Sequence, residues 1–183
     1  MLSLFYRVAA GSVAEPAYGP GGFPQDLSHG EPVASVPMPR QPLTRAVLDG
    51  QRAALGLPPY TGADEPAALR RAALDTALAA REAGVEPALP VQRAAVRELL
   101  DRLAALAPGR SVEVRVPPYA AVQCVAGPHH TRGTPPNVVE MDPPTWIALA
   151  TGGLTWEDAM RYGKVRASGP RADLSGLLPL PPG

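Results

Sequence analysis

The chain is predicted to fold as an α+β domain, with helices over one face of a five-stranded sheet and an irregular arm at the N-terminus. Three observations predict this class. A helix with an apolar stripe ends near residue 107, short strand-like runs follow from residue 112, and two sharply capped helices precede the last strand. The expected order is α-β(3)-crossover-β-α-β, which places helices and strands in separate layers.

Composition limits the function classes. With 183 residues, the chain has room for one domain and an appendage. Its 17 basic and 17 acidic residues balance, and no concentrated basic surface for nucleic acid is expected. The charge of Arg7 follows a short apolar run, the wrong order for a secretory signal, and no apolar stretch approaches the ~20 residues of a membrane span. We therefore expect a cytoplasmic protein without stable membrane insertion.

Residues 1–63 are predicted to form a poorly structured arm. Proline and glycine recur every few residues from Gly11 to Gly62, which prevents a long helix or an inner strand. The arm is either disordered or extended over the domain, with room for a short helix over residues 45–55. It is also a candidate attachment point for a protein partner.

Two longer helices follow the arm. Residues 64–84 begin with an acidic cap and Pro66 and end at Gly84, but their leucines stand among alanines, so we expect a weakly packed connector helix. The domain proper is expected over residues 86–183. Its first helix, over residues 91–107, carries the apolar spacing of one buried face. That face comprises Val96, Leu99, Leu100, Leu103 and Leu106.

Four strand-like runs are expected before the next helix. Residues 112–116 alternate valine with charged residues, which predicts one buried and one solvated face. Residues 120–126 are apolar except for Gln123, which predicts a more central strand. A short third strand is expected over 129–132, and residues 134–136 form a rigid crossover into the strand at 138–141.

The C-terminal part shows clear stop and start signals. Asp142 is expected to cap a helix whose opening turn holds two prolines, and Thr155 is expected to cap a second helix. Gly163 supplies a left-handed exit. A last strand over residues 164–168 and a leucine-rich tail complete the chain.

These residues resemble a known family. Residues 142–169, DPPTWIALATGGLTWEDAMRYGKVRASG, are similar to the C-terminal half of the sterol carrier protein 2 family, with its capped helix, glycine break, short helix and Gly-Lys-led strand. Residues 110–140, RSVEVRVPPYAAVQCVAGPHHTRGTPPNVVE, resemble its bacterial, chiefly actinobacterial, branch, the bacterial SCP orthologues. The same module is similar to the C-terminal domain of mycothiol-dependent maleylpyruvate isomerases. The resemblance covers residues 90–180 and implies an SCP2-like domain with a mixed sheet.

The resemblance implies a hydrophobic tunnel between sheet and helices that binds a lipid, fatty acyl chain or sterol. His130 and Arg132 are candidate contacts for an anionic head group, although an ion pair of Arg132 with Glu140 or Asp142 that pins the crossover is the favoured interpretation of that arginine. Alternatively, the residues able to form the tunnel wall simply fill a core. They are Val112, Val114, Val116, Val122, Cys124, Val139, Met141, Trp146, Leu149, Leu154, Trp156, Met160 and Leu174.

No catalytic, cofactor or metal site is expected. His129 and His130 are adjacent on a strand, so their side chains point to opposite faces. Cys124 has apolar neighbours, which favour an inert thiol. The leading hypothesis is a non-catalytic carrier. The alternatives are a structural or protein-interaction module with a filled core and an accessory domain related to the isomerases, although no histidine lies between His29 and His129 to supply their metal site.

Overall fold

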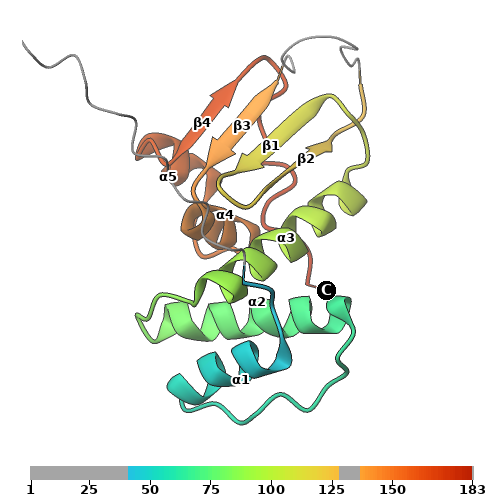
Figure 1. The fold of residues 1–183 in the computed structure, drawn as a ribbon. Coiled ribbons are helices and arrows are strands. Elements are labelled where there is room, and N and C mark those ends of the chain that lie inside the picture. The colour runs from blue at the N-terminus through green and yellow to red at the C-terminus, as the bar shows by residue number, and fades with distance from the viewer. Residues whose placement is uncertain (1–40, 128–136, 183) are drawn as a thin grey trace, which may run out of the picture. The chain divides into compact units, whose positions relative to one another are not determined.

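The computed structural model describes residues 41–127 and 137–182, which form five helices and a four-stranded sheet (Figure 1). All of these residues belong to one compact unit of the chain. Among these residues, each helix is too short or too polar to cross a bilayer. The elements are α1 Arg45–Ala54, α2 Pro66–Glu82, α3 Leu89–Leu106, β1 Val112–Val116, β2 Ala120–Cys124, β3 Val138–Met141, α4 Pro143–Ala150, α5 Trp156–Arg161 and β4 Val165–Ser168.

The described strands are ordered β2-β1-β3-β4, and their directions make the sheet mixed. β1 pairs antiparallel with β2 and parallel with β3, and β3 pairs antiparallel with β4. The strand expected at 129–132 and the crossover at 134–136 lie outside the described residues. Among the four strands that the structure describes, β2 lies at an edge, which differs from the more central position that we expected. Its apolar composition comes largely from alanine, and Ala121 remains exposed.

Helices α3 and α4 cover one face of the sheet (Figure 1). The three valines of β1 are fully buried, and the indole Nε1 of Trp146 on α4 donates a hydrogen bond to the carbonyl of Val96 on α3, 3.3 Å away. The expected inner face of α3 is confirmed at Val96, Leu99, Leu100 and Leu103. Leu106, at the border of this stripe and the end of the helix, is 46% exposed instead.

Helices α1 and α2 pack against α3, which differs from the arm and connector that we expected over residues 41–84. The helix expected near residues 45–55 is confirmed as α1, and its Leu48 is fully buried. α2 buries a face made mostly of alanine, including Ala73 and Ala80, so it approaches α3 closely. Residues 1–40 of the expected arm lie outside the described residues.

The expected helix ends are confirmed after β3. The Asp142 carboxylate accepts a hydrogen bond from the Thr145 amide at 2.7 Å, and the Thr155 hydroxyl accepts one from the Asp158 amide at 3.1 Å. Gly163 ends α5 with a φ of 63°. The tail then returns to the helices, where the Leu180 amide donates to the Ala150 carbonyl at 2.9 Å.

Candidate functional site

Most of the residues predicted to line a tunnel lie in the packed core. Each is at most 4% exposed and belongs to one apolar cluster formed by the sheet and the helices. Four hollows on the surface of the described residues are lined almost entirely by other side chains, with Met141 as the exception in this group. The buried set is Val112, Val114, Val116, Cys124, Val139, Met141, Trp146, Leu149 and Leu174.

The remaining predicted residues lie nearer the surface. Val122, Leu154 and Trp156 are half-buried beside the core, and Met160 on α5 is 42% exposed. Of these four, Leu154 alone borders one of the four hollows. The head-group candidates His130 and Arg132 lie outside the described residues. The structure therefore places most of the predicted set in the buried core.

Leu154 lines a better candidate site, which we call the α2–α4 groove. It runs between the C-terminal half of α2, the α2–α3 loop, the start of α4 and the α4–α5 loop, and its volume is about 470 Å³. Its lining is mainly apolar. The apolar side chains are Ala77, Val85, Pro87, Pro144, Ile147, Ala148 and Leu154.

Small residues allow this groove to form. Ala77 on α2 and Ala148 on α4 both border it, and neither side chain extends beyond a methyl group. Gly153 in the α4–α5 loop allows the guanidinium of Arg81 to lie over the backbone, because a Cβ there would come within 2.8 Å of Arg81 Nη1. Arg81 Nη2 donates a hydrogen bond to the Gly153 carbonyl at 3.3 Å, which fixes a cation at one wall.

The charged groups of the groove are two cations and one acid. Arg81 and Lys164 carry the positive charges, and Glu86 carries the negative one. Within the described part of the chain, neither cation forms an ion pair shorter than 4.0 Å. The groove thus combines an apolar surface with one net positive charge.

The described residues supply little reactive chemistry near this groove. They contain no group of three or more His, Cys, Asp or Glu side chains able to hold a metal ion. Burial raises the pKa of the Cys124 thiol to about 11, which keeps it protonated and unreactive near neutral pH.

Sequence reasoning missed both cations of the α2–α4 groove. Arg81 lies on α2, which we interpreted as a weakly packed connector, and Lys164 lies far along the chain. One signal was present, because Lys164 is the only lysine among 17 basic residues. An ammonium group at this one position differs chemically from the guanidinium used elsewhere.

Comparison with known proteins agrees with the topology of the second half of the chain. Residues 90–180 match the model of a family described as bacterial SCP ortholog, whereas no curated protein matches the chain. The matched region begins with α3 and includes the whole sheet, α4, α5 and most of the tail. Through residues 90–180, the chain belongs to the bacterial SCP ortholog family, a bacterial SCP2-like family.

Proposed function

We propose that this protein is a non-catalytic binding module for an amphiphilic small molecule, held in the α2–α4 groove. The ligand class is an acyl chain or similar apolar body with a single anionic head group. The observation that carries the proposal is the apolar groove with two cations at its walls, in a chain that belongs to a carrier-type family. The cytoplasmic location expected from the sequence stays a prediction.

The apolar lining supports the proposal through the hydrophobic effect. Each methylene group that leaves water contributes about 0.8 kcal/mol before the cost of ordering the ligand. Ile147 and Ala148 are only 5% exposed and Leu154 is half-buried, so they offer a preformed apolar wall. Because the groove opens at the surface, a ligand can reach this wall without displacing the packed core.

The charges support an anionic head group. Arg81 and Lys164 face the same groove as Glu86, so one positive charge remains uncompensated among the lining residues. A carboxylate would match that charge and accept hydrogen bonds from the guanidinium or the ammonium group. A neutral sterol could accept a hydrogen bond from either cation but would not neutralise its charge.

The test is a chain-length series. Hexanoate, octanoate and decanoate are titrated into the full-length protein and followed by calorimetry. We expect the affinity to rise about fourfold per methylene until the groove is filled, which is the 0.8 kcal/mol increment expressed as a ratio. Binding that does not saturate, or an affinity independent of chain length, would contradict the proposal.

Charge variants locate the binding site. Lys164→Gln should weaken decanoate binding about threefold to tenfold, the effect of one partly exposed charge, and should leave decanol binding unchanged. The matched control is Arg161→Gln, because Arg161 is an exposed cation outside the groove that pairs with Glu157 at 2.9 Å. Equal losses in the two variants would show that the effect is nonspecific.

A second candidate function is a structural or protein-interaction module. The packed inner face of the sheet favours it, since Val114, Val139 and Trp146 are all fully buried. Under this hypothesis, the fatty acids would show no saturable binding, and the full-length chain would retain a stoichiometric protein partner in a pull-down from its native cell extract. The titration and the pull-down therefore separate the two candidates.

A further inference from the structure

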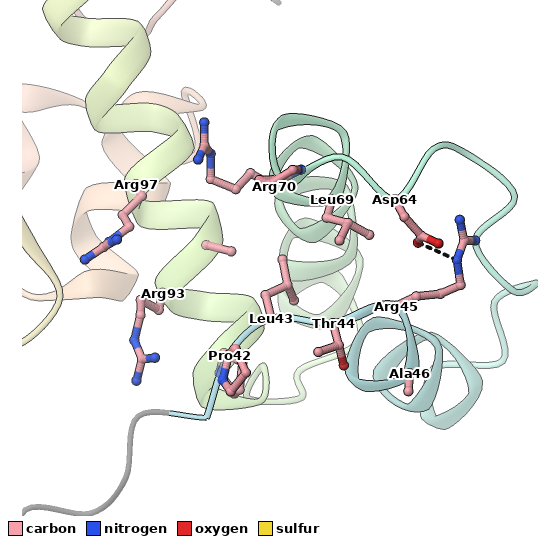
Figure 2. Close-up of a pocket in the computed structure, with 13 residues that line it drawn as sticks. Pro42, Leu43, Thr44, Arg45, Ala46, Asp64, Leu69, Arg70, Arg93 and Arg97 are labelled. Atoms are coloured by element: carbon pink, nitrogen blue, oxygen red, sulfur yellow. Dashed lines mark hydrogen bonds and ion pairs between the residues drawn. The ribbon is translucent and has the colours of Figure 1, made fainter.

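A second hollow lies at the N-terminal end of α2, and we call it the arginine groove. It is bordered by residues 42–46, the start of α2 and the N-terminal half of α3, and its volume is about 630 Å³ (Figure 2). Its charged lining consists of four arginines, Arg45, Arg70, Arg93 and Arg97, and one acid, Asp64. The arginines therefore outnumber the single acid in the lining, and their ion-pair partners determine which positive charges remain uncompensated.

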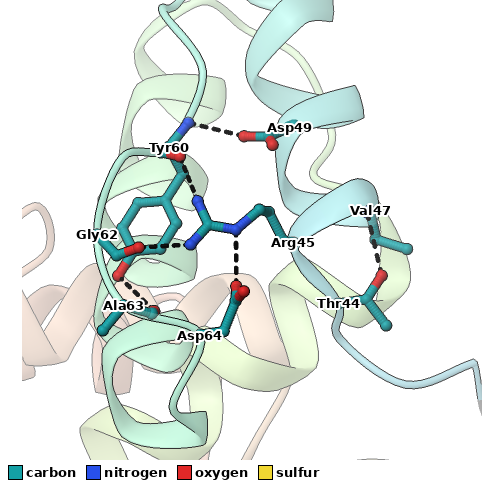
Figure 3. A network of polar contacts seen from close by, with 8 residues as sticks. All are labelled: Thr44, Arg45, Val47, Asp49, Tyr60, Gly62, Ala63 and Asp64. Carbon is teal, nitrogen blue, oxygen red and sulfur yellow. Dashed lines mark hydrogen bonds and ion pairs between the residues drawn. The ribbon is translucent and has the colours of Figure 1, made fainter.

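Arg45 is fully engaged in holding the α1–α2 loop. Its Nε donates to the Asp64 carboxylate at 2.7 Å, and its two terminal nitrogens donate to the carbonyls of Tyr60 and Gly62 (Figure 3). The guanidinium also lies 5.0 Å from the centroid of the Tyr60 ring. Arg45 and Asp64 therefore compensate each other, and neither needs a ligand.

Arg70 is balanced by acids of α3. Its Nε lies 3.6 Å from Glu98 Oε2, and its Nη2 lies 3.8 Å from Asp101 Oδ2. These separations bring charge compensation, but the buried Nε finds no hydrogen-bond acceptor among the described residues. Arg70 thus contributes no uncompensated charge, although it leaves a donor without a partner in the wall of the groove.

Arg93 and Arg97 are the cations without compensation. They stand four residues apart on α3, and Figure 2 shows both side chains leaving that helix on the same side. Arg93 Nη1 donates to the Gln41 carbonyl at 3.1 Å, and its guanidinium lies 5.7 Å from the Tyr119 ring, but both partners are neutral. Within the described residues, no carboxylate lies within 4.0 Å of either arginine.

The proximity of Arg93 and Arg97 has an energetic cost. Like charges four residues apart destabilise a helix by a few tenths of a kcal/mol, and the first turn of α3 holds no acid to offset them. A ligand that carries two negative charges would remove the repulsion and neutralise both guanidinium groups. Phosphate monoesters carry close to that charge above neutral pH, and guanidinium forks match their oxygens.

From these contacts we propose that the arginine groove binds a small organic molecule bearing a phosphate group, with Arg93 and Arg97 as its phosphate ligands. Leu43 and Leu69 line the same groove, so the organic part of the ligand has an apolar surface to cover. The site shares no lining residue with the α2–α4 groove and does not depend on the function proposed there.

The test uses phenyl phosphate and benzoate as probes of the full-length protein, at about pH 8, where the phosphate is a dianion. Binding is followed by NMR through the arginine Nε–Hε signals. Phenyl phosphate should shift the Arg93 and Arg97 signals saturably, with an affinity at least about tenfold above that of benzoate. Absence of saturation, or equal affinity for both probes, would overturn the proposal.

Single variants complete the test. Arg93→Gln and Arg97→Gln should each lower the phenyl phosphate affinity at least about tenfold, the effect of losing charge-assisted hydrogen bonds. Arg110→Gln serves as the control, because Arg110 is an exposed arginine outside the groove that donates to Gln123. Without ligand, Arg97→Gln should melt at or above the wild-type temperature because it removes repulsion. A clearly lower melting temperature, or an equal loss of affinity in the control, would overturn the assignment.

Discussion

Replacing Asn137 by alanine should destabilise the fold more than any other amide substitution in the described residues. Asn137 is the only asparagine of the chain and is 3% exposed at the start of β3. Its Nδ2 donates to the Ser111 carbonyl at 2.7 Å, and its Oδ1 accepts from the Arg171 amide at 3.0 Å. One side chain therefore joins the start of β1, the start of β3 and the segment after β4.

The size of the destabilisation follows from the two backbone groups that lose their hydrogen-bond partner. In Asn137→Ala, the carbonyl of the fully buried Ser111 loses its side-chain donor, at a cost of about 1–3 kcal/mol. The Arg171 amide is nearer to solvent, so its loss adds only about 1 kcal/mol. We therefore expect the free energy of unfolding to fall by about 2–4 kcal/mol.

Urea denaturation followed by the fluorescence of the buried Trp146 measures this change. The matched control is Gln123→Ala, which removes an exposed amide whose one side-chain hydrogen bond among the described residues is with Arg110 at 3.0 Å, and it should cost less than about 0.5 kcal/mol. If the two variants differ by less than about 1 kcal/mol, water replaces the lost bonds and the reasoning about Asn137 fails.

Two further predictions concern a buried thiol and a loop. Because burial raises the pKa of Cys124 to about 11, the unfolded chain loses this proton first, so the stability advantage of wild type over Cys124→Ala should shrink by about 2 kcal/mol as the pH rises from about 8 to about 11. Chemical unfolding at several pH values measures this difference, and a constant difference would contradict it. Arg45→Lys should cost about 1–2 kcal/mol, because an ammonium group cannot reproduce the planar fork that joins Tyr60, Gly62 and Asp64 (Figure 3). Faster hydrogen exchange confined to α1 and the α1–α2 loop would support it, whereas wild-type exchange would not.

Local chemistry made part of the fold predictable. The caps at Asp142 and Thr155 and the exit at Gly163 depend on a few neighbouring atoms, and the structure confirms each of them. The strict alternation of β1 likewise predicted its buried valines. These features need no information about distant residues, which is why the sequence alone indicates them.

Packing between segments that are distant in the sequence was harder to predict from the sequence alone. The face that α2 buries is rich in alanine, so it shows no leucine stripe in the sequence, yet Ala73 and Ala80 are fully buried against their neighbours. A tunnel wall and a filled core also require the same apolar residues, so Val114 or Trp146 could not distinguish them in advance. Arg81 lies on α2 and Lys164 lies directly before β4, so only the fold brings these two cations of the α2–α4 groove together.

Helix α2 connects these observations, because it lies outside residues 90–180, where the family match is found, and yet contributes a wall to both grooves. Arg70 and Leu69 face the arginine groove, and Ala77 and Arg81 face the α2–α4 groove. The α3 residues Val91, Ala95 and Leu99 are fully buried in a domain where α2 packs along α3, so the matched region relies on that cover. If the two proposed binding sites are correct, ligand selection in this chain depends on a helix that the family match does not include. On that proposal, Arg81→Gln should alter fatty acid affinity without a change in any matched residue.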